Sequence, residues 1–233
     1  MTAPTPFGYF DLLEAFPQPG CAVCRLLDHD VDRYLDTLLF EFPVDPVMQN
    51  QFRDSRGLCH EHSWRLPGYN NALATAILYN AVLDEMLQVS EQTTPAERPN
   101  AFARLRGNVT NSALADALAP SKPCPACVVC SDAEKRYLHV LGELINEKRM
   151  HEAFQQSEGL CLPHFRGVLL AVRDPENARL LTTIQRDIWL SLKGKLELFL
   201  HKMDAHYHQQ IGDEATSWLR AIAKIAGEKQ NGQ

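Results

Sequence analysis

Apolar residues recur three and four positions apart along most of the chain, and Pro, Gly and polar residues separate these stretches. The stretch from Ala22 to Phe40 is the clearest, and Pro43 and Pro46 follow it closely. The same spacing predicts further helices at about 47–55, 58–65, 70–89, 101–118, 126–143, 161–172, 175–208 and 214–226, with one more short helix before Gly159. Because no stretch alternates in the way of a half-buried strand, the sequence predicts an all-α fold.

Two segments of the chain resemble each other, which indicates an internal duplication. The corresponding positions are Cys21 and Cys24 with Cys124 and Cys127, at a shift of 103 residues, and Cys59 and His62 with Cys161 and His164, at a shift of 102. Apolar positions such as Phe52 and Phe154 keep the same register. We therefore predict a pseudo-twofold repeat, with the first helical repeat at 1–98, a connecting helix and linker at 99–122, and the second repeat with a C-terminal helix at 123–233.

Each copy carries a Cys-x-x-Cys pair followed, one long and one short helix later, by Gly-Leu-Cys-x-x-His. A Cys and a His three residues apart share one face of a helix, and Cys₃His is a standard ligand set for structural zinc. We expect each copy to form its own site, a helical hairpin clipped at its open end, which gives two zinc ions per chain. The predicted metal ligands are Cys21, Cys24, Cys59 and His62 in the first copy and Cys124, Cys127, Cys161 and His164 in the second.

Other uses of the same cysteines have to be weighed against zinc. An iron–sulfur cluster or a thiol redox sensor would use the same residues, and buried core cysteines would need no metal. The duplication favours metal binding, because core packing does not require Cys at six matched positions and His at two. The seventh cysteine, Cys130, corresponds to Leu27 at the shift of 103, so we predict that it packs in the core and is not a ligand.

The two motif regions, Cys21–His62 and Cys124–His164, resemble the signature of an uncharacterised bacterial family, a domain of unknown function. The resemblance covers both copies of the Cys-x-x-Cys and Gly-Leu-Cys-x-x-His pattern. It implies a shared pair of motifs and no assigned activity, so the functional argument rests on the residues themselves.

Composition and charge narrow the classes of function. The 233 residues carry a net charge of −6, whereas nucleic-acid-binding proteins are usually basic, so we expect no nucleic-acid partner. No apolar run approaches the roughly 18 residues of a membrane-spanning helix, and Met1–Phe10 lacks the basic and apolar regions of a secretory signal. We therefore predict a cytoplasmic protein without a membrane partner, in a compartment that keeps thiols reduced.

The sequence contains no phosphate-binding glycine loop, serine elbow or dinucleotide-binding fingerprint. Four protein ligands would also close each zinc site and leave no position for a substrate. We therefore predict no catalytic residues and no organic cofactor, and favour a non-enzymatic scaffold that binds an unknown protein partner or itself. Two alternatives stay open: the iron–sulfur or thiol redox sensor, and an enzyme whose pocket lies between the two copies.

Overall fold

A computed structural model of the protein describes residues 6–93, 112–203 and 212–229. These residues form helices joined by turns, and none of them lies in a strand, so the predicted all-α class is confirmed. Within the same ranges, no helix combines the length and the apolar character that crossing a membrane requires.

The chain divides into two compact units that do not coincide with the predicted repeats. The first unit combines Met1–Asp30 with Cys130–Asn231, and the second is formed by Val31–Val129. Both boundaries fall inside a helix, one in α2 (Ala22–Phe40) and the other in α8 (Pro125–Leu144). The predicted divisions at 98 and 123 instead fall within the second unit, which includes residues on either side of both positions.

The first unit is built around a hydrophobic core to which the start of α2 and most of α8 contribute. Its other elements are α1 (Tyr9–Ala15), α9 (Lys148–Gln156), α10 (Leu162–Ala171), α11 (Pro175–Met203), the 3₁₀ helix η2 (Asp213–Thr216) and α12 (Ser217–Ala226). Leu12, Leu141 and Phe154 are fully buried in this core. The pattern of apolar residues did not predict α1, whose seven residues are too few for helical spacing to stand out.

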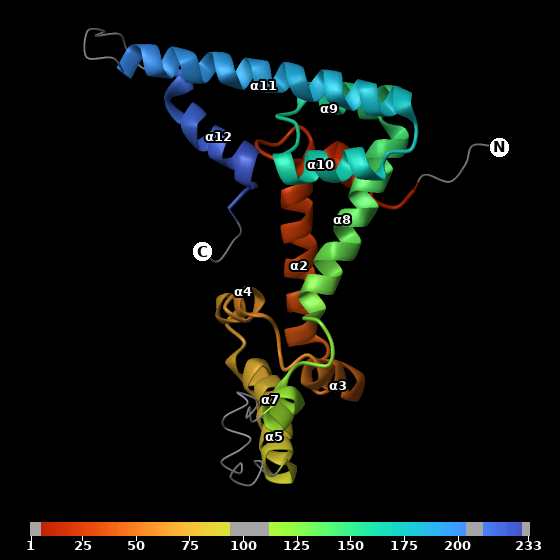
Figure 1. The fold of residues 1–233 in the computed structure, drawn as a ribbon, viewed down its shortest axis with the longest axis vertical. Coiled ribbons are helices and arrows are strands. Elements are labelled where there is room, and N and C mark those ends of the chain that lie inside the picture. Colours follow the sequence, from red (N-terminus) through yellow and green to blue (C-terminus); the bar gives the residue numbers. More distant parts are fainter. Residues whose placement is uncertain (1–5, 94–111, 204–211, 230–233) are drawn as a thin grey trace, which may run out of the picture. The chain divides into compact units, whose positions relative to one another are not determined.

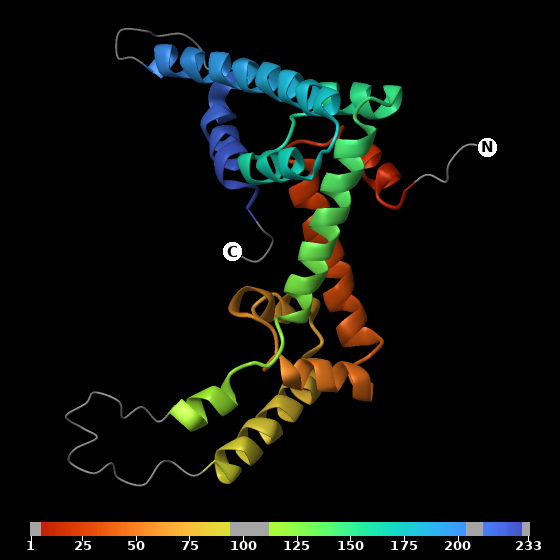
Figure 2. The same ribbon diagram turned by 45° about the vertical axis from the view of Figure 1, so that its right-hand side comes forward.

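The long helix α11 and the short helix α12 lie against each other in the first unit, and α12 also contacts α10 (Figures 1 and 2). Glu214 in η2 connects the end of α11 to the residues before α12. Its Oε1 accepts hydrogen bonds from Lys202 Nζ at 2.7 Å and from the Gly212 N–H at 2.9 Å. The end of α12 thereby lies close to the start of α10, which carries the predicted ligands Cys161 and His164.

The second unit contains the remainder of α2 together with α3 (Pro46–Asp54), α4 (His60–Ser63), the 3₁₀ helix η1 (Leu66–Tyr69), α5 (Ala72–Gln92), α7 (Ser112–Leu118) and the start of α8. Its buried side chains include Leu35, Phe52 and Leu78. The rings of Phe52 and Tyr79 meet edge to face with centroids 5.2 Å apart, which joins α3 to α5.

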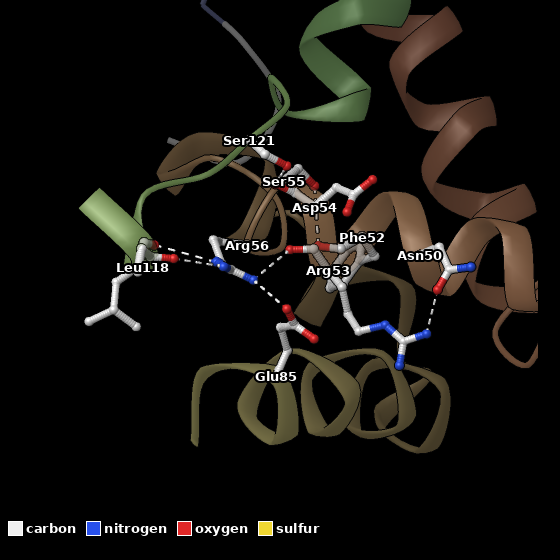
Figure 3. A network of polar contacts seen from close by, with 10 residues as sticks. Asn50, Phe52, Arg53, Asp54, Ser55, Arg56, Glu85, Leu118 and Ser121 are labelled. Carbon is white, nitrogen blue, oxygen red and sulfur yellow. Dashed lines mark hydrogen bonds and ion pairs between the residues drawn. The ribbon is translucent and has the colours of Figure 1, made fainter. Parts of the chain in front are cut away.

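Arg56 connects three elements of the second unit (Figure 3). Its guanidinium donates to the carbonyl oxygens of Ala117 at 3.0 Å, Leu118 at 3.4 Å and Arg53 at 3.3 Å, and lies 3.6 Å from Glu85. Three carbonyls and one carboxylate thus surround one cation. This arrangement fixes the end of α7 beside α3 and α5, and so fixes the chain that enters the second Cys-x-x-Cys pair.

Several helix boundaries follow from the residues that cap them. The side chain of Asp45 accepts from the Met48 N–H at the start of α3, and Asn71 accepts from the Ala74 N–H at the start of α5. The predicted helix at 58–65 is shorter in the structure, because α4 ends at Ser63 and gives way to η1. Of the helices predicted at 101–118 and 175–208, residues 101–111 and 204–208 lie outside the described part of the chain.

Candidate metal centres

The eight predicted ligands gather in two groups of four. Cluster A consists of Cys21, Cys24, Cys161 and His164, and cluster B of Cys59, His62, Cys124 and Cys127. In each group, one potential ligand atom from every residue lies within 4.8 Å of all the others. Cluster A belongs entirely to the first unit and cluster B to the second.

This grouping corrects the predicted pairing within each copy. Each cluster takes its Cys-x-x-Cys pair from one copy and its Cys-x-x-His pair from the other. The physical reason is the length of the helices. The 19 residues of α2 span about 28 Å, whereas the nine residues of α3 span about 13 Å, at about 1.5 Å per residue. The short helix is therefore too short to bring the chain back from the end of α2 to its beginning.

The ligand atoms of cluster A are spaced like the corners of a small tetrahedron. His164 Nδ1 lies 3.5, 3.4 and 3.1 Å from the Sγ atoms of Cys21, Cys24 and Cys161, and the Sγ atoms of Cys24 and Cys161 are 3.6 Å apart. A tetrahedral zinc ion with ordinary bond lengths needs S···S edges of about 3.8 Å and S···N edges of about 3.6 Å. The residues of cluster A therefore fit a zinc ion with only small adjustments.

Cluster B has nearly the same spacing. His62 Nδ1 lies 3.2 Å from Cys59 Sγ, 3.6 Å from Cys124 Sγ and 3.4 Å from Cys127 Sγ, and the Sγ atoms of Cys59 and Cys127 are 3.7 Å apart. In both clusters the histidine presents Nδ1, so the donor set is three sulfur atoms and one imidazole nitrogen. This set suits zinc, because thiolate sulfur and imidazole nitrogen are the ligands that zinc prefers in structural sites.

The ligands stand at equivalent places in their helices. Cys21 and Cys124 directly precede α2 and α8, and Cys24 and Cys127 lie in the first turns of these helices. Cys59 and Cys161 are the N-cap residues of α4 and α10, with extended backbone. Backbone N–H groups at a helix start can stabilise the negative charge of a thiolate once it binds a metal.

The turns that lead into these cysteines depend on glycine. Gly57 and Gly159 have φ values of +85° and +72°, which L side chains rarely adopt. Gly159 is followed by Leu160, whose N–H and C=O both pair with the side-chain amide of the buried Gln185, at 2.9 and 3.1 Å. The Gly-Leu dipeptide in the motif therefore places the Cys-x-x-His turn against the core.

Two acidic residues that the sequence reasoning missed support cluster A. His164 Nε2, the nitrogen that faces away from the thiols, lies 3.7 Å from Glu134 Oε1. The Cys21 N–H donates to Glu228 Oε1 at 2.8 Å. A carboxylate beside the second nitrogen of a ligating histidine fixes its orientation and raises its basicity. Neither position carries a signal in the sequence, since Glu228 follows the last predicted helix and Glu134 corresponds to Val31 in the first copy.

The two clusters differ in their exposure to solvent. Cys21 and Cys161 are fully buried and His164 is 8% exposed. In cluster B the histidine is buried, but Cys127 is exposed. Cys130 belongs to neither cluster and packs against the hydrophobic core of the first unit.

Burial and contacts among the cluster residues shift several of their pKa values. Burial alone would lower the pKa of His164, but contacts with Cys161 and Cys21 outweigh it and raise that pKa to about 10. Hydrogen bonds from Cys161 and Cys24 lower the pKa of Cys21, while those from Cys161 and Cys21 raise the pKa of Cys24. Burial lowers the pKa of His62, and burial together with Cys59 raises the pKa of Cys127 to about 12.

Comparison with known proteins gives a family and no activity. The chain is 31% identical over 72 residues to an uncharacterised 23.9 kDa protein in the xynA 3′ region of Caldicellulosiruptor sp. (strain Rt8B.4). The match covers 31% of this chain and 35% of that relative, so it spans about a third of the relative's length. No solved structure matches the chain. The sequence model of a family of unknown function, DUF6062, matches residues 12–232, and the chain therefore belongs to this family, as its resemblance to an uncharacterised family predicted.

Proposed function

We propose that the protein is a non-enzymatic scaffold in which clusters A and B each bind one structural zinc ion. The spacing of the ligand atoms carries this proposal, because three sulfur atoms and one imidazole nitrogen lie within 4.8 Å of one another in both places. Each set joins a Cys-x-x-Cys turn to a Cys-x-x-His turn that lies far away in the sequence. A metal at such a place contributes its binding free energy to folding.

Four protein ligands fill a tetrahedral coordination sphere, and this supports a structural role over a catalytic one. A catalytic zinc site keeps a position for water or substrate, whereas each donor set here offers three thiols and one imidazole, which is enough to fill all four positions. The acidic groups near cluster A, Glu134 and Glu228, contact the His164 ring and a backbone N–H, as supporting residues of a structural site do.

An exposed apolar face supports a protein partner or self-association. On α12 the side chains of Trp218, Leu219, Ile222 and Ile225 are between 46% and 61% exposed, while Ser217 and Lys224 of the same helix are buried. An apolar helix face that is exposed in the described part of the chain is typical of interaction surfaces. The net charge of −6 supports a partner other than nucleic acid, and the reduced thiols that the clusters need suit a cytoplasmic setting.

The decisive experiment is metal analysis of protein purified under reducing conditions without added metal. We expect about two zinc ions per chain and no absorbance in the visible range. One ion or none would contradict the proposal. Iron with inorganic sulfide and a brown colour would instead support an iron–sulfur protein.

One observation favours a thiol redox sensor as the second candidate. Cys127 is exposed, and its Sγ lies 3.7 Å from that of Cys59, so the metal-free cluster B places two thiols close enough to form a disulfide after a small movement. Zinc release coupled to disulfide formation under mild oxidation, reversed by a thiol reductant, would support this candidate. Retention of both zinc ions under the same oxidation would exclude it.

A further inference from the structure

The first unit contains a cavity of about 460 Å³ lined by the end of α9, the middle of α11 and one side of α12. Its volume lies within the range of small-molecule sites. Helix α11 supplies an aliphatic wall of Ile184, Ile188 and Leu192, which share one helix face because they lie four residues apart. Three basic side chains also line the cavity: Lys195, Arg220 and Lys224. The pocket therefore combines an apolar wall with a cationic one.

Two donors of Arg220 find no acceptor among the described residues. Its Nη1 lies 3.7 Å from Glu158 Oε1, but its Nε and Nη2 are buried and have no hydrogen-bond partner within the described chain. Leaving charged donors buried and unpaired is unfavourable. Nε and one Nη atom form the parallel pair of donors that binds both oxygens of a carboxylate. The unpaired edge of Arg220 therefore matches a planar anion.

The surrounding contacts hold the basic groups in place. Lys224 is 4% exposed, and its Nζ donates to the carbonyl oxygens of Glu158 at 2.6 Å and Gly159 at 3.4 Å. The other oxygen of Glu158, Oε2, accepts from the Gly20 N–H at 3.0 Å. The carboxylate beside Arg220 is thus engaged on both sides. Groups fixed by their neighbours bind a ligand with less loss of conformational entropy.

The charge of the lining also favours an anion. Asp187 and Glu158 are the acidic residues of the lining, against the three basic residues Lys195, Arg220 and Lys224. One positive charge is therefore in excess, even before the Gly20 N–H contact to Glu158 is considered. A neutral or cationic ligand would leave this excess and the unpaired Arg220 edge uncompensated.

We propose that this pocket binds a small organic carboxylate with an aliphatic chain. The carboxylate takes the Nε and Nη2 donors of Arg220 after a rotation of this side chain, because both atoms are covered as the side chain lies in this structure, and the chain of the ligand lies along Ile188 and Leu192. This assigns the first unit a ligand site that is separate from the metal ligands, and it holds whether or not clusters A and B bind zinc.

Isothermal titration of the 233-residue chain, as purified under reducing conditions, tests the proposal with three probes: octanoate, 1-octanol and inorganic phosphate. We expect saturable binding of octanoate and at least about tenfold weaker binding of the other two, which corresponds to about 1.4 kcal/mol. Octanol binding as tightly as octanoate would overturn carboxylate recognition. Phosphate binding as tightly as octanoate would mean a simple anion site and overturn the aliphatic part. Absence of octanoate binding would overturn the whole proposal.

Variants locate the site. Arg220→Gln should weaken octanoate about tenfold or more, and Arg220→Lys should weaken it less, because it keeps the charge and loses the paired donors. The matched control is Lys193→Gln, a basic residue on α11 that does not line the pocket and pairs with Glu197. Should the Arg220 variants lose metal or helicity, Leu192→Gln supplies the test: it should weaken octanoate and leave acetate unchanged. Equal octanoate affinity in wild type, Leu192→Gln and folded Arg220 variants would place binding elsewhere.

Discussion

Individual ligands owe their chemistry to where the backbone places them. Cys59 and Cys161 begin short helices, and Cys21 and Cys124 directly precede long ones. Each of these cysteines lies where helical N–H groups have no partner within the helix, a position that suits the negative charge of a metal-bound thiolate. The histidine then follows three residues after its cysteine and reaches the same point in space.

The pairing of ligands across the two copies can be tested with double alanine variants. Cys21→Ala with Cys161→Ala removes two ligands of cluster A, so we expect one zinc ion per chain to remain in cluster B. Cys21→Ala with Cys59→Ala removes one ligand from each cluster, so we expect less than one zinc ion after dialysis against a weak chelator. Metal analysis of the two proteins side by side checks this. The reverse stoichiometry would show that the ligands pair within each copy, as the sequence predicted.

Metal affinity should depend on pH, because the metal-free clusters carry protons that the metal must displace. The raised pKa values of His164, about 10, and Cys127, about 12, mean that both side chains are protonated at neutral pH. A bound metal requires the neutral imidazole and the thiolate. Affinity should therefore rise with pH, and binding should release protons into a weak buffer. Competition titrations with a chelator of known pH dependence, at about pH 6, 7 and 8, measure this. A pH-independent affinity would contradict it.

At the scale of single residues, the sequence identified the eight residues that the fold gathers, because a repeated motif makes each position visible twice. It could not show which pairs meet. That depends on the length of α2 relative to the return through α3, and on contacts between segments more than a hundred residues apart, such as Cys24 with His164. Glu134 escaped notice for a similar reason, since it acts on a ring from another helix.

Among the helices, long amphipathic elements such as α2 and α11 were predictable because their apolar positions recur over several turns. Helix α1 was missed. It is held by long-range contacts, including the hydrogen bond from Tyr9 Oη to Glu147 at 2.6 Å, and the local pattern does not contain them. The start of α11 was predicted correctly, since the helix predicted at 175–208 begins at Pro175 in the structure.

Two glycines provide a matched test of how the Cys-x-x-His turn is built. A Cβ on Gly159 would lie 2.8 Å from both Gln185 Oε1 and Ile188 Cδ1, at a backbone φ of +72°. Gly159→Ala should therefore destabilise the protein by about 1–3 kcal/mol. A Cβ on Gly194 would meet nothing within 4 Å, inside α11. Gly194→Ala should be neutral or stabilise by up to about 1 kcal/mol. Urea unfolding of the metal-loaded variants gives both values, and equal changes would contradict this account of the turn.

In the whole molecule, the crossed pairing of the motifs determines where the chain can be divided without separating the residues of a cluster. Each compact unit contains one complete set of four ligands, while each of the predicted repeats at 1–98 and 123–233 contains half of each set. Cutting the chain between the repeats would thus separate the ligands of both clusters. The two motif regions therefore depend on each other, because each candidate metal centre combines residues from both.

Since each unit has its own cluster, the two zinc ions that we propose should leave the protein independently and at different rates. Cluster A has fully buried Cys21 and Cys161, and the Glu134 carboxylate lies beside its histidine, whereas cluster B exposes Cys127 to solvent. A chelator has to reach the metal or wait for the site to open, and both are easier where a ligand is exposed. We therefore expect two phases of zinc transfer to an excess of chelator, each close to one ion, with cluster B the faster. Variants assign the phases: Cys59→Ala should leave only the slow one and Cys161→Ala only the fast one. A single phase in wild type, or the opposite assignment, would show that exposure of Cys127 does not control the release of metal.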